Sequence, residues 1–246
     1  MYKATRGLVL RTVNYRESDK ILTVLTEDGG KLTLSARGAR KKSSKISAAA
    51  QLFAFSEMII HEHKGRFYLN EGRTLEMFSG LRQDIVTLST ASYFAEMLEA
   101  VSDEDVFNPG ILSLGLFALY RLSKRDRDER LIKSAFELRL MCLSGYEPEL
   151  AACMLCGGEP DTPLLDTTGG YIFCKNCKPY GDGNFATLCT GSLAAMRHVA
   201  GCAHERVFSF SVGEETLARL AYATEGYVQN QLVRSFKSLD FLKGIQ

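Results

Sequence analysis

The sequence lacks the motifs by which several large classes of enzyme are recognised. It contains no G-x-x-x-x-G-K-[ST] phosphate loop, no G-x-G-x-x-G after a strand, no G-x-S-x-G elbow and no H-E-x-x-H. Histidine is scarce, with four residues in the chain, which disfavours a catalytic mechanism that depends on histidine. Carboxylates are numerous, but their positions single out no pair. These absences favour a protein that works by binding, and we expect it to be no enzyme and to have no catalytic residues.

A long apolar stretch is also missing. No run of about eighteen apolar residues occurs, so the sequence predicts no membrane-spanning helix. The first residues, MYKATRGLVLRTVNY, carry polar and charged residues throughout, so we expect no signal peptide. The seven cysteines suit a reducing compartment, because four have metal-ligand spacing and Cys142, Cys189 and Cys202 have no evident partner. We therefore expect a cytoplasmic protein.

Four of the cysteines form two identically spaced pairs, in CMLC and CKNC. The full pattern is C-x2-C-x17-C-x2-C, which is typical of a four-cysteine zinc site. Between the pairs, LLDTTGGYIF predicts a small hairpin that holds the two turns face to face. Such a hairpin buries too little apolar surface to fold alone, so one structural Zn²⁺ would supply folding energy. The predicted ligands are Cys153, Cys156, Cys174 and Cys177.

Two other interpretations of these cysteines stay open. The pairs could form a redox dithiol, or an ancestral site that no longer binds metal. A catalytic zinc is disfavoured, because four thiolates leave no open position for water and no histidine is near them in the sequence.

Charge is divided unevenly along the chain. Residues 1–80 hold 14 Lys and Arg against 8 Asp and Glu, a net charge of +6. Residues 81–246 hold 16 against 21, a net charge of −5. A basic part followed by an acidic part predicts a polyanion as partner of the first and a different partner for the second.

The first 80 residues have the two-residue apolar period of β-strands. The five runs are RGLVLRTVNY, KILTVLTED, GGKLTLSARG, QLFAFSEMIIHEHKG and RFYLNEGRTLE, with a turn predicted at 28–30. Five short strands in a segment of this length predict a small closed barrel, and an OB-fold is the preferred candidate. A β-sandwich or an SH3-like barrel would satisfy the same pattern. The predicted fold class is α+β with several domains.

A basic segment, ARGARKKSSKIS, lies between the third and fourth of these strands. Its like charges repel one another on what we expect to be a flexible loop, and a nucleic-acid backbone would relieve that repulsion by releasing counterions. The alternative is a loop that is merely solubilising. The predicted phosphate contacts are Arg37, Arg40, Lys41, Lys42 and Lys45, and the patch could extend to Arg11, Arg16, Lys20 and Lys31.

Aromatic side chains of this part could stack on the bases of a single strand. The available rings are Tyr15, Phe53, Phe55, Phe67 and Tyr68, most of which we expect in the core. Tyr15 is the preferred platform because it ends a strand beside Arg16. The pair His61 and His63 indicates a surface or core position and not a metal site, because no third ligand is evident.

From Leu81 the apolar period becomes helical. Helices are predicted within 82–101, from Asn108 and Pro109 onward, within 129–146, at 190–201 and within 214–242. The predicted domains are an OB-fold at 1–80, a helical domain at 81–150 and 180–246, and a zinc module at 151–179 inserted in it. The mixed-charge stretch 124–130 is interpreted as a solvated turn. An acidic peptide could alternatively bind to Arg121, Lys124 and Arg125.

Several of these features together resemble one known family. They are GLVLRTVNYRESDKILTVLTEDGGKLTLSARGARKKSSK at 7–45, the order of the helices, the four-cysteine insert and RSFKSLDFL at 234–242. The chain resembles the RecO family of bacterial recombination mediators over nearly its full length, and its zinc-bearing branch in particular.

The resemblance implies a DNA repair role without nucleotide consumption. Such proteins bind single- and double-stranded DNA, anneal complementary strands, contact the acidic C-terminal tail of single-stranded DNA-binding protein, and act with RecR to load RecA. The basic stretch of the family falls on the five residues of 37–45 given above, and its zinc ligands on the four paired cysteines. It also implies a bacterial, nucleoid-associated location.

Two rival functions remain. In a protein-interaction scaffold of the repair machinery, the acidic helical domain would be the working part and the basic loop incidental. An enzyme such as a nuclease would need clustered acids and a divalent metal.

Overall fold

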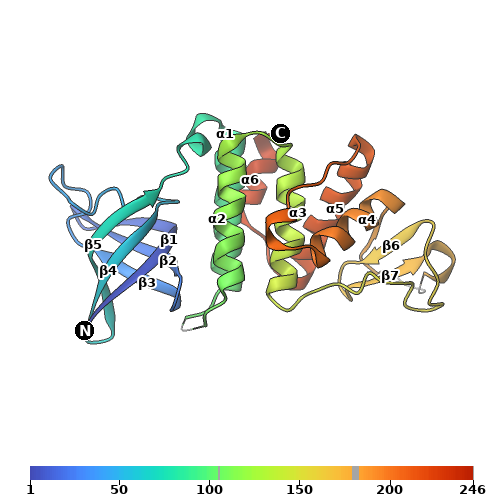
Figure 1. Ribbon diagram of the computed structural model, residues 1–246, viewed down its shortest axis with the longest axis horizontal. Helices are drawn as coiled ribbons and strands as arrows, with labels where there is room; N and C mark the ends of the chain where they lie inside the picture. The colour runs from blue at the N-terminus through green and yellow to red at the C-terminus, as the bar shows by residue number, and fades with distance from the viewer. Residues whose placement is uncertain (105, 179–182, 246) are drawn as a thin grey trace. The chain divides into compact units, whose positions relative to one another are not determined.

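The computed structural model describes residues 1–246 except 105, 179–182 and 246 (Figure 1). Contacts divide the chain into two compact units, one of residues 1–124 and 236–246 and the other of residues 125–235. The described elements of the first unit are β1 (Tyr2–Tyr15), β2 (Asp19–Thr26), β3 (Gly30–Ala36), β4 (Phe55–His63), β5 (Arg66–Glu76), η1 (Ser79–Gln83), α1 (Ile85–Val101), α2 (Pro109–Lys124) and α6 (Lys237–Ile245). Those of the second are α3 (Glu129–Leu143), β6 (Pro163–Asp166), β7 (Tyr171–Cys174), η2 (Lys175–Cys177), β8 (Phe185–Thr187), α4 (Thr190–Gly201), η3 (His204–Arg206) and α5 (Glu214–Leu232).

The first five strands close into a barrel in the order β1-β2-β3-β5-β4. Neighbouring strands are antiparallel except β3 and β5, which are parallel where Leu34 pairs with Phe67. The alternation seen in the sequence places Leu22, Val24, Leu34, Met58 and Ile60 in the barrel core. This confirms the five-stranded OB-fold and removes the sandwich alternative.

Glycine makes the predicted turn between β2 and β3 possible. Gly30 has φ 62°, a left-handed conformation that side chains with a Cβ rarely adopt. A Cβ at this position would also lie 2.6 Å from the carbonyl oxygens of Asp103 and Val106. The turn therefore requires glycine both for its backbone angle and for the close approach of the segment after α1.

Helices α1, α2 and α6 pack together beside the barrel in the first unit (Figure 1). Asp84 caps α1 by accepting a hydrogen bond from the Thr87 amide, and α2 begins at Pro109 as predicted. The closing RSFKSLDFL motif docks on α1, where Phe236 is fully buried 5.4 Å from the Tyr93 ring. Glu96 accepts hydrogen bonds from the Lys237 and Ser238 amides at the start of α6.

The second unit packs α3, α4 and α5 with the sheet β7-β6-β8. The helical run predicted within 214–242 is broken at Val233, which has φ 49°. Strands β6 and β7 form the hairpin that LLDTTGGYIF predicts, with Leu165 opposite Ile172. This confirms that a four-cysteine segment interrupts the helices. The boundary predicted at 179–180 lies outside the described residues, and the three-domain division stays a prediction. Across the described part of the chain, no helix is both long and apolar enough to span a bilayer.

Candidate nucleic-acid interface and metal centre

The basic segment is clamped to the barrel, contrary to the expectation of a flexible loop. The Arg40 amide donates to the Ser18 carbonyl at 2.9 Å, and the Gly38 amide donates to Asp19 Oδ1 at 2.8 Å. Farther along, the Phe53 amide donates to the Val9 carbonyl at 2.9 Å. Apolar side chains between these points enter the core, among them Ala39, Ile46 and Ala50. The cations are therefore presented from an ordered backbone.

All five cations of this segment are exposed: Arg37, Arg40, Lys41, Lys42 and Lys45. Within the described residues no ion pair engages any of them. Asp19 accepts a hydrogen bond from the segment's Gly38 amide, and its carboxyl pKa is lowered chiefly by that amide and further by Ser18, Arg16 and Arg37. The segment thus keeps most of its positive charge available for an anion.

Two grooves adjoin the segment, and one pair of side chains borders both. The loop groove, about 530 Å³, lies between residues 37–46 and the β4–β5 residues His61, His63 and 68–70. The sheet groove, about 480 Å³, lies over β2 and β3, the β1–β2 turn, and the β4–β5 turn with the first residues of β5. Arg37 lies over the Tyr68 ring at 4.5 Å from its centroid, and both residues line both grooves. The face over strands 2 and 3 and these two turns is where OB-folds bind oligonucleotides.

The other predicted DNA contacts divide into two groups. Tyr15 and Arg16 line the sheet groove, with the Arg16 guanidinium 5.2 Å from the Tyr15 ring. Arg11 pairs with the Glu99 carboxylate at 3.1 Å, and Lys31 donates to the Glu99 carbonyl at 2.9 Å. These last two cations serve the packing of the barrel against α1 and are not placed beside the basic segment.

Lys20 and three of the candidate rings take part in the internal contacts of the barrel. Lys20 donates to the Ala50 carbonyl at 3.0 Å, and burial together with Arg40 lowers its pKa. Phe53 is fully buried and Phe67 packs against the barrel core. Phe55 is half-buried in β4. Of the five rings considered, Tyr15, Phe67 and Tyr68 line the grooves, with Tyr15 exposed and the other two half-buried.

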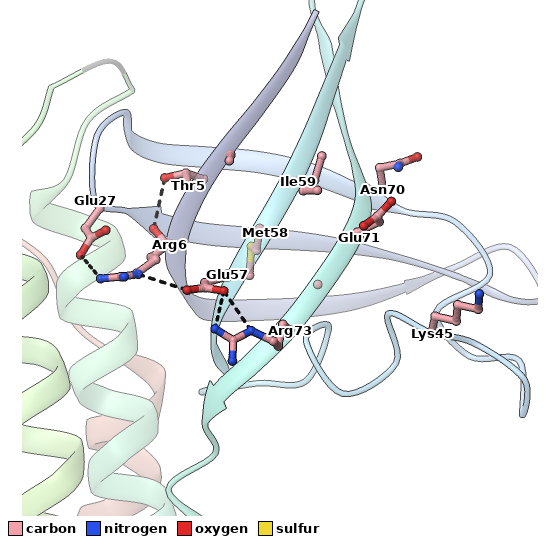
Figure 2. A pocket seen from close by; sticks show the side chains of 12 residues that line it. Thr5, Arg6, Glu27, Lys45, Glu57, Met58, Ile59, Asn70, Glu71 and Arg73 are labelled. Atoms are coloured by element: carbon pink, nitrogen blue, oxygen red, sulfur yellow. Dashed lines mark hydrogen bonds and ion pairs between the residues drawn. The ribbon is translucent and has the colours of Figure 1, made fainter.

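A larger hollow of about 1020 Å³ lies over β1, β4 and β5 (Figure 2). Its arginines are neutralised: Arg73 lies 2.7 Å from Glu57, and Arg6 lies 3.7 Å from Glu57 and 3.6 Å from Glu27. Figure 2 shows this chain of ion pairs, with Lys45 at some distance from it. The paired charges make this face a weaker site for a polyanion than the basic segment.

Sequence reasoning did not name Tyr2 or Arg66 near the grooves, and it gave His61 no binding role. Tyr2, His61 and Tyr68 are cross-strand neighbours on β1, β4 and β5, and their rings form a row. Ring centroids are 4.7 Å apart for Tyr2 and His61, 6.4 Å for His61 and Tyr68, and 6.2 Å for His61 and His63. Arg66 lines the sheet groove and is exposed. The alternation of His61 and His63 is the local signal that both point to one face of β4.

The four paired cysteines converge as predicted. The Sγ atoms of Cys153, Cys156, Cys174 and Cys177 all lie within 4.8 Å of one another. Those of Cys156 and Cys174 are 3.7 Å apart, and the Cys174 amide donates to the Cys153 sulfur at 3.3 Å. A donor set made of sulfur alone at this spacing is consistent with one soft or borderline metal ion.

The electrostatics of the cluster point the same way. Burial acts to raise the pKa of Cys153, but backbone amides, Cys156 and Cys174 first among them, hold it at about 6. The pKa of Cys174 is raised to about 12 by burial and by the sulfurs of Cys156 and Cys153. The Cys153 thiolate therefore forms readily, whereas ionised Cys174 and Cys177 beside it need a cation to offset the repulsion between their charges.

Helices α4 and α5 hold the cysteine segment in place within the second unit. Arg197 of α4 donates to both Glu159 carboxylate oxygens at 2.8 and 3.0 Å, and to the carbonyls of Leu150 and Ala151 at 2.8 Å. Gln231 of α5 donates to the Thr168 carbonyl at 2.8 Å. The segment's own apolar cluster is small, with Cys153, Leu164 and Phe173 at its centre.

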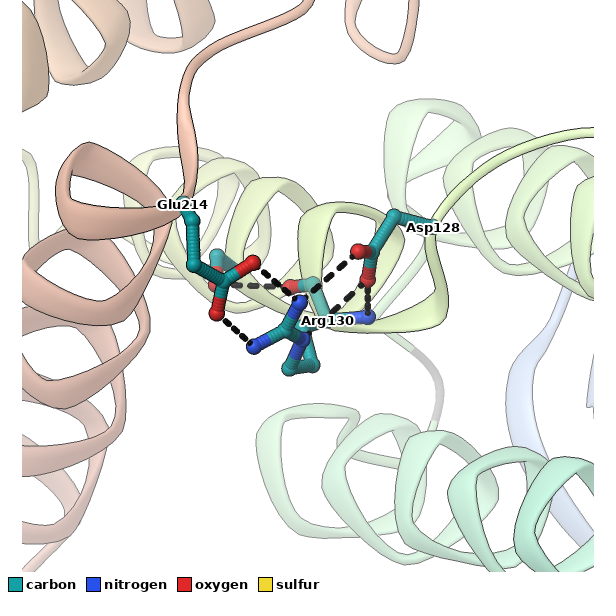
Figure 3. A network of polar contacts seen from close by, with 4 residues as sticks. Asp128, Arg130 and Glu214 are labelled. Atoms are coloured by element: carbon teal, nitrogen blue, oxygen red, sulfur yellow. Dashed lines mark hydrogen bonds and ion pairs between the residues drawn. The ribbon is translucent and has the colours of Figure 1, made fainter.

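The residues predicted to bind an acidic peptide lie at the end of α2 and directly after it. Arg121 and Lys124 lie in the last turn of α2, where cations favour the negative end of the helix dipole. Arg125 belongs to the other compact unit. The following stretch is structural: Arg130 pairs with Glu214 at 2.6 Å and with Asp128 at 3.0 Å (Figure 3). Asp128 also caps α3 by accepting from the Arg130 amide.

Fold and site together define the class of protein: an OB-fold barrel joined to a helical part that carries four converging cysteines suited to a metal ion. Comparison with known families narrows the class. A family model described as Recombination protein O N terminal matches residues 1–78, and one described as Recombination protein O C terminal matches residues 82–240.

Curated relatives match over nearly the whole chain. A protein named DNA repair protein RecO from Acetivibrio thermocellus is 30% identical over 243 residues, covering 98% of this chain and 96% of its own. One of the same name from Symbiobacterium thermophilum is 30% identical, covering 96% and 94%. A third, from Syntrophomonas wolfei, is 29% identical, covering 99% and 98%. The chain belongs to the RecO family.

Proposed function

We propose that this protein is a DNA-binding recombination mediator in DNA repair and that it works by binding without catalysing a reaction. It binds single- and double-stranded DNA through the barrel and anneals complementary strands. The observation that carries the proposal is the clamped segment 37–45, with five exposed cations that no described carboxylate pairs with. The names of its RecO relatives support the repair role.

Annealing follows from the electrostatics of such a surface. Cations that hold two strands by their phosphates screen the repulsion between them, and complementary bases can then pair without sequence readout by the protein. A recruited partner would raise the local concentration of strands. The family relationship supports two such partners, the acidic tail of single-stranded DNA-binding protein and RecR, with RecA loading as the outcome. The cations proposed for the acidic tail are Arg121, Lys124 and Arg125.

The metal proposed for the cysteine cluster is one structural Zn²⁺. Four thiolates at about 2.3 Å from a tetrahedral zinc lie about 3.8 Å apart, close to the 3.7 Å between Cys156 and Cys174. When bound, zinc would supply folding energy that the small apolar cluster lacks. Four protein ligands leave no position for substrate, which supports a structural role.

A salt series tests the DNA-binding proposal. Fluorescence anisotropy with a labelled single strand between about 50 and 200 mM salt should give a slope of about −3 in log affinity against log salt, for four to five phosphate contacts. The variant R40A/K41A/K42A should reduce the magnitude of that slope by about two units.

The matched control is K3A/R6A/R73A, which removes three barrel cations that already pair with Asp28, Glu27 or Glu57. It should leave the slope unchanged. If both triple variants change the slope equally, overall charge and not the basic segment determines binding, and the proposal fails.

A further inference from the structure

The barrel carries two separate cationic grooves, and each has its own charges and rings. The loop groove has Lys41 and Lys45, and its rings are His61 and His63. The sheet groove has Arg16 and Arg66, and its rings are Tyr15 and the half-buried Phe67, besides the shared Tyr68. Both combine side chains that attract phosphates with flat groups on which bases stack, which is how single strands are bound without sequence preference.

A single wall separates the grooves. Ser35, Arg37 and Tyr68 are the described residues that line both, and the Arg37 guanidinium lies 4.5 Å from the centre of the Tyr68 ring. A cation stacked on an aromatic face is held in place while its charge stays available on both sides. Two phosphate backbones on either side of this wall would each face the Arg37 charge.

The two grooves differ in their charge and in the placement of their aromatic rings, which suits two independent strands. Among its described lining residues the loop groove has no carboxylate, whereas the sheet groove includes Asp19 and Glu104. From the loop groove, the ring row runs on through His61 to Tyr2, whose rings stack 4.7 Å apart at 25°. Tyr2 is 64% exposed, so this row offers bases a path across β5, β4 and β1 and away from the sheet groove.

We infer that the two grooves hold two single strands at once, side by side, with the Arg37–Tyr68 pair between them. The inference rests on the proposed function and deepens it, because it assigns to one barrel the two sites that annealing requires. The loop groove holds its strand by Lys41 and Lys45 with bases on the ring row. The sheet groove holds the other by Arg16 and Arg66 with a base on Tyr15.

Native mass spectrometry of the full chain with oligo-dT of about seven nucleotides tests this directly, since OB-folds take about 4–16 nucleotides per site. The unaltered protein should bind two oligonucleotides at saturation. K41A/K45A and R16A/R66A should each bind one. The control K3A/R73A removes two cations that lie outside both grooves and pair with Asp28 and Glu57, and it should still bind two.

Oligonucleotides of twice that length distinguish one strand in each groove from one strand that crosses both grooves. With one strand in each groove, the protein still binds two of them. A count of one would mean that a single strand crosses the wall, and that result overturns the inference. Annealing of complementary strands should slow at least about tenfold in both groove variants, although each still binds one strand.

Failure of this inference is distinguishable from failure of the proposed function. If the unaltered protein binds one short oligonucleotide at saturation, DNA binding stands and the two-strand arrangement falls. If it binds none, the proposed function falls as well. The number of oligonucleotides that the unaltered protein binds tests the inference even if a variant fails to fold.

Discussion

Lys133 and Glu137, one helical turn apart on α3, form an ion pair with 2.8 Å between Nζ and Oε1. Their side chains are 10% and 0% exposed, and Lys133 also pairs with Glu225 at 2.8 Å. The Thr224 hydroxyl donates to the other oxygen of Glu137 at 2.8 Å. A buried network of this kind ties α3 to α5, because removing one member leaves a charge in a place that water does not reach.

Replacing Lys133 by Met should lower the free energy of unfolding by about 3 kcal/mol, since the buried Glu137 carboxylate loses its ammonium partner. Burial acts to lower the pKa of Lys133, but Glu137 and Glu225 outweigh it and the pKa is raised. A raised lysine pKa stabilises the fold below the ordinary value of 10.5, and this contribution is lost only as the pH rises through the folded pKa. Burial also raises the pKa of Glu137, so without Lys133 this carboxyl can relieve part of the loss by binding a proton, and less so at higher pH. The loss measured in urea titrations should therefore be at least as large at about pH 9 as at about pH 7.

The matched control is the exposed pair Arg219–Glu215, which has the same spacing and an N–O distance of 2.9 Å. E215Q should change stability by less than about 0.5 kcal/mol. Equal effects of K133M and E215Q would show that burial does not set the strength of the α3 pair.

Metal removal should unfold the cysteine segment before the rest of the protein. The unaltered chain should contain one zinc by elemental analysis, and C156S should contain none. Without the ion, the small cluster of Leu164, Phe173 and Cys153 cannot hold the two turns together, so residues 151–178 should become sensitive to protease.

The control for this variant is C202S, which changes a cysteine far from the cluster in sequence and outside the converging group. It should keep its zinc and its protease resistance. A C156S protein that resists protease as well as the unaltered chain would remove the structural role of the metal.

The carboxylate of Asp19 should weaken DNA binding while it fixes the basic segment. It accepts the Gly38 amide at 2.8 Å, and its charge lies near Arg16 and Arg37. D19N keeps an oxygen acceptor and removes the charge, so affinity for a single strand should rise about two- to threefold. D19A also loses the acceptor and should increase hydrogen exchange at the Gly38 amide.

The pH dependence of that exchange has a definite sign. Because the pKa of Asp19 is lowered in the folded protein, its contribution is complete above the ordinary value of 3.8 and is lost as the pH falls through the folded pKa. Protection of the Gly38 amide should be the same at about pH 5 and about pH 7. Weaker binding by D19N would show that Asp19 organises the segment more than it repels DNA.

Much of the architecture could be predicted because its signals are local. The two-residue period places Leu22, Val24 and Leu34 inside the barrel, since strand side chains alternate. The cysteine spacing indicated one cluster because each C-x-x-C turn brings two sulfurs together. The hairpin and the start of α2 at Pro109 likewise follow from residues adjacent in sequence.

The sequence by itself therefore determined the strand periods, the position of the basic segment and the identity of the four converging cysteines. Only the tertiary structure decided which cations are available to an anion. Arg11 forms an ion pair with Glu99 and Lys31 donates to the Glu99 carbonyl, whereas Lys41 and Lys45 border a groove. It also aligned Tyr2, His61 and Tyr68 and set Arg37 on a ring 31 positions away in sequence. These relationships depend on strand register and on packing between distant segments, and neither can be predicted from the local apolar period of the sequence.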